Sequence, residues 1–419
     1  MFTSRFVNTF LILQAVFLCL LSATFGAEAT KLDLETAVRL GLERNLELKA
    51  KREELGIAEG RVIRSNLFLQ HNPEIEGDVA NKRLRKPEEG FSKNLLQGGV
   101  SLSQEFEIGG QPGYRREAAQ RSFRKVGFEI SDFERTLRFR VTELFLKLLN
   151  IKAKLEQAGQ IVDLRGQLYE ASKTRLALGD IPAVQLIVAE FELNRVKSEA
   201  ISLEREYEES LSRLRTDLVL EKEEKIELAG DLPRAPLAAS LSELLKSALD
   251  RRPDLAALDQ EKRVAEAEEL LTRAERIPNV KFGFFYDKDD KDNVFGGRIS
   301  IPLPVFDRKQ AELREALSRK SIANLGYLHK RRALENEIQA AFAKFKLAEK
   351  ELALYPEGTL KKFDEGLDLY QRAYQERAVD LADTILFQNQ VIEARLKFID
   401  ALTNYNLTLA ELKLQAGIE

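Results

Sequence analysis

The sequence predicts a mainly helical protein made of two tandem copies of one unit, each with a β-hairpin and a long helical hairpin. The first observation is an internal repeat, because residues 34–50 (LETAVRLGLERNLELKA) match residues 241–257 (LSELLKSALDRRPDLAA). The second is a composition with 23 Gly, 11 Pro, 8% aromatic residues and no Trp, which fits long helices better than a β-sandwich. The third is apolar spacing that alternates between three and four over long segments, typical of a coiled-coil seam.

The repeat extends over nearly the whole chain. Its further matches are 73–75 with 278–280, 100–106 with 299–305, and Gly179-Asp180-Ile181 with Val379-Asp380-Leu381. The shift between copies drifts by a few residues, as small loop insertions would cause. We therefore predict a first repeat at 30–225 and a second at 226–419, and we expect the function to need both copies.

The first 29 residues are predicted to be a secretory signal peptide. Arg5 precedes an apolar run at 6–21, which is too short and too interrupted by polar residues for a membrane span. Small residues follow and offer cleavage after Gly26 or Ala29. The single cysteine, Cys19, lies in this run, so the mature chain would have no disulfide and no thiolate metal ligand.

Each copy then carries two stretches in which apolar and polar residues alternate. We predict strands at about 73–81 and 97–107 in the first copy, and at about 278–287 and 294–305 in the second. Strands of this length with one apolar face suit a membrane β-barrel with a water-filled lumen, and several aromatic residues could lie at the membrane interface: Phe282, Phe284, Phe285, Tyr286 and Phe295. Four strands cannot close a barrel, so several copies of the chain would have to build it. The alternative is a small soluble sheet that caps the helices.

The helical hairpins are predicted at about 112–218 and 308–415. Nothing stronger than an isolated glycine interrupts the helical pattern from Tyr114 to Leu178, and at ~1.5 Å per residue such a helix is on the order of 100 Å long. A break at 179–182 then reverses the chain into an antiparallel partner helix. In the second copy Pro356 should kink or break the first arm, so the two hairpins should not be equivalent.

Composition and motifs exclude several other classes of function. The 65 basic and 68 acidic residues give a net charge of -3, which does not favour nucleic-acid binding. The chain has no phosphate-binding loop, no zinc-protease motif and no nucleophile elbow, so we expect no enzymatic activity and no cofactor. His71 and His329 are the only histidines and lie far apart in the repeat pattern, so no metal-ligand relay is evident.

Two charged loops each allow a binding interpretation and a plainer one. The aspartates at 287, 289, 290 and 292 could hold calcium, but the loop lacks the glycine and distal glutamate of an EF-hand, so a solvated hairpin loop is the favoured explanation. The run Lys82–Lys86 could contact lipopolysaccharide phosphates, or could simply be an exposed loop.

The element order and three motifs resemble the outer membrane efflux proteins similar to TolC. The motifs are EFEIGG at 105–110 followed by Arg115-Arg116, GDIP at 179–182, and IPLPVFDR at 301–308, and they are similar to those of the heavy-metal, cobalt-zinc-cadmium type channels. The resemblance implies a trimeric α/β barrel in the outer membrane of a Gram-negative cell, in contact with membrane lipid. It also implies a helical tube in the periplasm that docks on a periplasmic adaptor and an inner-membrane RND-type pump.

The same resemblance gives roles to the two helical turns. Their residues would form the periplasmic tips on which the adaptor docks: Gly179, Asp180, Ile181, Pro182, Val379 and Leu381. Asp380 and Asp383 could form rings of negative charge that narrow the entrance and attract cations. Alternatively, Asp380 caps the helix and Asp383 is a solvated acid of its first turn. The first copy has Asp180 but Ala183, so such a gate would be asymmetric.

The resulting hypothesis is a passive conduit for heavy-metal cations in a tripartite efflux system. The same kind of channel could instead serve drug efflux or type I protein secretion. A different class, a soluble periplasmic coiled-coil scaffold, would follow if the strands did not enter a membrane.

Overall fold

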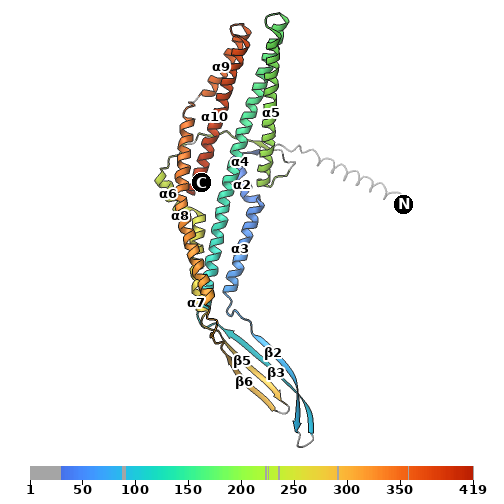
Figure 1. The fold of residues 1–419 in the computed structure, drawn as a ribbon, viewed down its shortest axis with the longest axis vertical. Coiled ribbons are helices and arrows are strands. Elements are labelled where there is room, and N and C mark those ends of the chain that lie inside the picture. Colours follow the sequence, from blue (N-terminus) through green and yellow to red (C-terminus); the bar gives the residue numbers. More distant parts are fainter. Residues whose placement is uncertain are drawn as a thin grey trace, which may run out of the picture. The chain divides into compact units, whose positions relative to one another are not determined.

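The computed structural model describes residues 30–86, 91–221, 224, 226–234, 236–289, 292–356 and 358–418. The predicted signal peptide lies outside these residues. The first half of the chain forms β1 (Thr30–Leu32), α2 (Leu34–Arg44), α3 (Leu46–Ser65), β2 (Glu74–Lys86), β3 (Phe91–Phe106), α4 (Gln111–Ala177) and α5 (Ala183–Leu218). The second half forms β4 (Ile226–Leu228), α6 (Leu241–Arg251), α7 (Pro253–Ala274), β5 (Val280–Asp289), β6 (Asp292–Ser300), α8 (Gln310–Leu352), α9 (Thr359–Gln375) and α10 (Leu381–Ala416). The prediction of a mainly helical chain with strand hairpins is confirmed (Figure 1).

The chain divides into two units, and the longest helices contribute to both. The first unit contains the residues up to Leu46, Thr136–Ala238 and Ala341–Leu414. The second contains Glu47–Arg135, Ala239–Ala340 and the last residues from Gln415. No helix in the part of the chain that the structure describes is both long and apolar enough to cross a membrane.

The four long strands form one antiparallel sheet in the second unit, in the order β2-β3-β5-β6 (Figure 1). Its register places Ile75 opposite Leu102 and Leu102 opposite Phe284, so apolar residues of neighbouring strands share a face. Large apolar side chains on this face are exposed: Ile75, Val79, Leu96, Val100, Leu102, Phe282, Phe284, Phe295 and Ile299. The other face carries mainly polar and small residues, as the alternation predicts.

The strand bounds differ from the predicted ones in three of the four strands. β6 stops at Ser300, whereas the alternating pattern predicted a strand to about 305. Pro302 and Pro304 have no N–H group to donate to a ladder, so the apolar alternation continues there without strand pairing. β2 and β3 are each longer than predicted.

The helical arms of the two copies differ as the sequence indicated. α4 runs for 67 residues without a break. In the second copy α8 ends at Leu352, shortly before Pro356, and the arm resumes as the separate helix α9. The first unit is packed around large buried side chains that include Leu148, Phe345 and Tyr405, and the rings of the last two are 5.2 Å apart.

A buried polar residue joins each pair of short helices to the end of the last helix of the same copy. Asn45, between α2 and α3, donates from its side-chain amide to the carbonyl oxygen of Asp217 at 3.1 Å, near the end of α5. Arg252, between α6 and α7, occupies the matching position and donates to the carbonyl oxygen of Gln415 at 3.2 Å, near the end of α10. Asn45 and Arg252 are both 4% exposed. We call these two residues the elbow residues.

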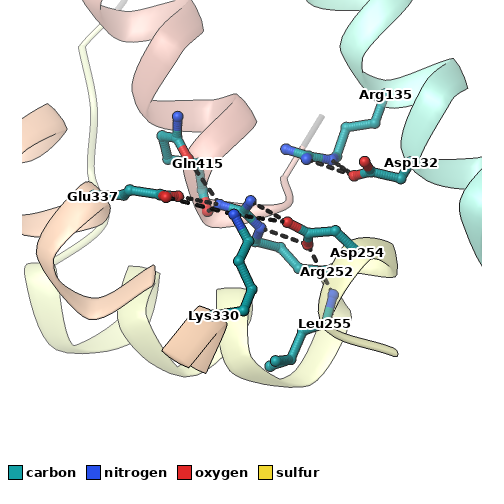
Figure 2. Close-up of polar contacts among 8 residues, drawn as sticks. All are labelled: Asp132, Arg135, Arg252, Asp254, Leu255, Lys330, Glu337 and Gln415. Carbon is teal, nitrogen blue, oxygen red and sulfur yellow. Dashed lines mark hydrogen bonds and ion pairs between the residues drawn. The ribbon is translucent and has the colours of Figure 1, made fainter. Parts of the chain in front are cut away.

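The second elbow residue is the centre of a charged cluster (Figure 2). Arg252 donates two hydrogen bonds to the Asp254 carboxylate, at 2.9 and 2.5 Å, and one to the Gln415 side-chain oxygen at 2.7 Å. The Lys330 ammonium lies 3.3 Å from Asp254 and 3.4 Å from Glu337. Each buried charge in the cluster therefore has an opposite charge beside it, as burial requires.

This cluster predicts a specific sensitivity to acid. Burial alone would raise the pKa of Asp254, but the hydrogen bonds from Arg252 and the charges of Arg252, Lys330 and Arg135 lower it to about 2. Because the folded pKa is depressed, the stabilisation is present above the ordinary pKa of 3.8 and is lost as pH falls from about 4 to about 2. We expect up to about 2 kcal/mol of stability to disappear over this range. Acid unfolding followed by circular dichroism should show a smaller loss of stability over these pH values in Asp254→Asn than in the wild type, and equal losses would contradict the assignment.

Candidate functional site

The two turns that close the helical hairpins lie in the first unit, at the top of Figure 1. In the first turn Gly179 adopts φ 78°, a left-handed conformation that glycine tolerates at no steric cost. The Asp180 N–H donates to the carbonyl of Arg175 at 2.9 Å, which closes the end of α4. Pro182 then precedes α5 in an extended conformation.

The second turn has the same backbone pattern with different residues. Arg377 takes the left-handed conformation at φ 64°, and the Ala378 N–H donates to the carbonyl of Ala373 at 2.8 Å. Asp380 then precedes α10. The structure therefore pairs Asp380 with Pro182, three residues after the left-handed residue in each turn, whereas the sequence match paired Asp380 with Asp180.

The two gate candidates have different surroundings. The Asp380 carboxylate accepts the backbone N–H of Asp383 at 2.8 Å, so Asp380 does cap α10. Asp383 is exposed in the first helical turn, where a negative charge is favoured. Both side chains are exposed, so capping leaves the charge of Asp380 open to solvent.

An ion pair joins the two turns. The Asp180 carboxylate lies 2.6 Å from the Arg377 guanidinium. Arg377 was not among the residues predicted to form the turns. The sequence signal for it is weak: a basic residue in the second turn, where the first turn has the acidic Asp180. This pair ties the first helical hairpin to the second at their ends.

Beneath the ion pair is a small buried core. Tyr374, 1% exposed, lies with Leu168, Ala189 and Leu381 in one apolar cluster. Its hydroxyl is 3.1 Å from the hydroxyl of Ser172, and the Arg175 guanidinium lies 5.0 Å from the centre of its ring.

A buried arginine makes the next link between the hairpins. Arg165 of α4 donates to the side-chain oxygens of Gln388 and Asn389 of α10, both at 2.6 Å. It is 1% exposed, and burial lowers the pKa of its guanidinium. Neutral amides thus hold a desolvated cation, which fixes the positions of α4 and α10 relative to each other.

The predicted docking residues divide into exposed and buried ones. Gly179, Asp180 and Pro182 are exposed, whereas Ile181 is 6% and Leu381 is 3% exposed. Ile181 and Leu381 therefore support the turns from inside. An exposed apolar stripe beside the first turn was not predicted, although its spacing of three and four residues is visible in the sequence: Val184, Ile187, Val188 and Phe191.

The other candidate residues do not come together at the turns. His71 lies 3.7 Å from Glu105 in the second unit, and His329 belongs to α8. Asp290 and residues 87–90 lie outside the described residues. Across the described ranges no group of three or more His, Cys, Asp or Glu side chains is placed to hold a metal ion.

The fold is that of outer-membrane channel proteins. A membrane protein from Pseudomonas aeruginosa matches with a TM-score of 0.77 at 18% identity, over 94% of this chain and 95% of the other. The open state of the MtrE outer membrane channel of Neisseria gonorrhoeae matches with a TM-score of 0.75 at 18% identity, over 92% and 89% of the two chains.

Two sequence similarities agree with this fold. Residues 244–417 match the family described as outer membrane efflux protein. The cobalt-zinc-cadmium resistance protein CzcC of Cupriavidus metallidurans is 22% identical over 376 residues, which cover 89% of this chain and 87% of that protein. Residues 244–417 are thus similar to the outer membrane efflux protein family, and the fold of the chain is that of outer-membrane channels.

Proposed function

We propose that the chain is the outer-membrane component of a tripartite efflux system and that it passes heavy-metal cations outward as a homotrimer. An inner-membrane RND-type pump supplies the energy, and a periplasmic adaptor docks at the two helical turns. In this proposal residues 1–29 are a signal peptide, and the repeats at 30–225 and 226–419 each contribute one strand hairpin and one helical hairpin. The observation that carries the choice of cargo is the exposed acidic pair Asp380 and Asp383, in a chain similar to a protein named for cobalt, zinc and cadmium resistance.

The sheet supports assembly from several copies. Its two edge strands, β2 and β6, run in opposite directions, because three antiparallel pairings separate them. β6 of one copy can therefore pair antiparallel with β2 of the next, and three copies give a closed barrel of twelve strands. Closure removes both edges and turns the exposed apolar face toward lipid.

The turns support an entrance that attracts cations. Threefold symmetry converts Asp380 and Asp383 into two rings of carboxylates, which raise the local concentration of cations. The pair Asp180–Arg377 joins the hairpins at the same ends, so an adaptor that contacts the exposed residues of the turns acts directly on this link. The apolar stripe from Val184 to Phe191 offers an apolar surface for this contact.

Removing charge without removing the cap tests the gate. Asn caps helices as well as Asp does, so Asp380→Asn keeps α10 intact while it deletes the negative charge. In planar bilayers we expect Asp380→Asn combined with Asp383→Asn to lower the preference for cations over anions, while the loss of charge at the start of α10 lowers stability by less than about 1 kcal/mol. Asp380→Ala removes the cap as well and should cost about 1 kcal/mol.

The control is Asp231→Asn, an exposed acid outside both turns, which should leave selectivity unchanged. Equal selectivity in the wild type and the double variant would reject the gate but keep the channel. The cargo is tested in cells by deleting this channel and measuring resistance to cobalt, zinc and cadmium; unchanged metal resistance with lost drug resistance would redirect the proposal to drug efflux.

A further inference from the structure

Two residues of opposite charge lie on the polar face of the sheet, one on each edge strand. Arg298 lies on edge strand β6 and contacts the Phe285 ring at 5.4 Å, but it has no carboxylate partner among the residues that the structure describes. Asp78 lies on the opposite edge strand, β2, also on the polar face. Both side chains are exposed.

Asp78 lies in a locally acidic position. A Cβ atom built on Gly99 would stand 2.9 Å from a carboxylate oxygen of Asp78 and 2.1 Å from one of Asp287. The carboxylates of Asp78 on β2 and Asp287 on β5 therefore lie close to the same residue, Gly99 of β3, which is between them. Within the described residues neither carboxylate has an ion-pair or hydrogen-bond partner, so a cation placed beside them would relieve their repulsion.

The geometry of a closed barrel shows which residue of the next copy Arg298 meets. Within one chain Arg298 lies on the same row across the sheet as Glu74, through Gly283 and Ser103. In a barrel with strands tilted ~35–45° and ~4.8 Å apart, four strands shift this row by roughly four to six residues from one copy to the next. The shift must be even to keep the apolar faces continuous.

Only one direction of the shift leaves the strands paired. A shift toward the start of β2 would place Arg298 opposite residues that precede Glu74, outside the strand. The other direction aligns all of β6 with residues of β2. A shift of four then places Arg298 directly opposite Asp78 of the next copy, and a shift of six places it opposite Ala80 and diagonal to Asp78, which a long side chain still reaches.

We propose that Arg298 of each copy forms an ion pair with Asp78 of the neighbouring copy and thereby closes the seam between β6 and β2 on the luminal face. The inference rests on the proposed trimeric barrel. The neighbour's guanidinium neutralises the carboxylates of Asp78 and Asp287, and its long side chain spans either register. The pair fixes the register between copies, because a slip by one residue would turn Arg298 toward lipid.

Charge exchange tests the pair energetically. Arg298→Asp and Asp78→Arg each place like charges at the seam. When samples are heated stepwise and then run on a gel, we expect the trimer band of each single variant to disappear at a lower sample temperature than that of the wild type. The double variant Arg298→Asp with Asp78→Arg restores the opposite charges and should recover most of that loss. Singles that migrate like the wild type, or a double variant whose loss is the sum of the two singles, would overturn the pair.

Disulfide cross-linking tests the register directly. In a chain with Cys19→Ser, Arg298→Cys should form an intermolecular disulfide with Asp78→Cys or Ala80→Cys, seen as covalent trimers that reduction dissolves. The matched control is Arg298→Cys with Gln97→Cys, on the polar face of the inner strand β3, which is too far for a disulfide. Cross-linking through Glu74→Cys instead, or through neither predicted position in an intact trimer, overturns the inference while the channel stands. A wild-type protein that forms no detergent-extracted trimer would instead reject the proposed function.

Discussion

Arg252→Leu is expected to lower the free energy of unfolding by about 3–5 kcal/mol, because the substitution breaks a buried charge network from its centre. Arg252 is 4% exposed and donates hydrogen bonds to Asp254, to the Gln415 side chain and to the Gln415 carbonyl. Without it, the positive charges that still stabilise the Asp254 carboxylate are those of Lys330, at 3.3 Å, and Arg135, and the end of α10 loses its hydrogen bonds to residue 252.

The measurement is denaturant unfolding of the detergent-purified protein, followed by helical circular dichroism. Arg252→Lys keeps the charge but loses the two-pronged geometry, so it should fall between the wild type and Arg252→Leu. Arg263→Leu is the matched control, since Arg263 forms an ion pair with Asp259 one helical turn away but is largely exposed. We expect it to change stability by less than about 0.5 kcal/mol. Equal losses for Arg252→Leu and Arg263→Leu would show that the cluster contributes little.

Tyr374→Ala is expected to destabilise the hairpin ends by about 3–5 kcal/mol. The side chain is 1% exposed, and its removal leaves a cavity among Leu168, Ala189 and Leu381. Tyr374→Phe should cost only about 1 kcal/mol, because it deletes the hydroxyl contact with Ser172 while that serine still donates to the Leu168 carbonyl.

Hydrogen exchange of the turn segments would measure this loss locally. Amides of residues 165–190 and 370–390 should exchange faster in Tyr374→Ala, and those of the sheet should not change. Tyr370→Ala is the control on the same helix; Tyr370 stacks on Phe387 but is only half-buried, so its loss should have a smaller effect. Unchanged exchange in Tyr374→Ala would mean that the polar contacts between the hairpins, among them Asp180–Arg377, Gln167–Gln371 and Arg165–Gln388, hold the hairpin ends together without the Tyr374 side chain.

The long helices, the break in one helical arm and the apolar face of the sheet could be predicted from the sequence. Unbroken spacing of three and four predicted α4, Pro356 predicted the interruption between α8 and α9, and strict alternation predicted which sheet face is apolar. The two periodic signals are strong because each extends over many residues, and the proline signal is strong because the ring prevents a helical hydrogen bond.

The predictions were wrong where an alternating sequence pattern continued beyond the end of the strand, and where an element was too short to give a recognisable pattern. Alternation continued past Ser300, but two prolines ended the hydrogen-bonded strand. The parallel pair of β1 with β4 is only three residues long on each side. At the turns, sequence similarity aligned Asp380 with Asp180, whereas alignment on the residues with positive φ, Gly179 and Arg377, places Asp380 opposite Pro182. The positive φ of Arg377 has no reliable signal in the sequence.

The elbow residues could have been found by aligning the two copies, since Arg252 stands where Asn45 stands in the first. Each copy joins its short helices to its own last helix, but one uses a neutral amide and the other a salt-bridged guanidinium. Acid weakens only the second connection. Near pH 3 a single cooperative melting curve should therefore split into two, with the second unit melting at a lower temperature than the first.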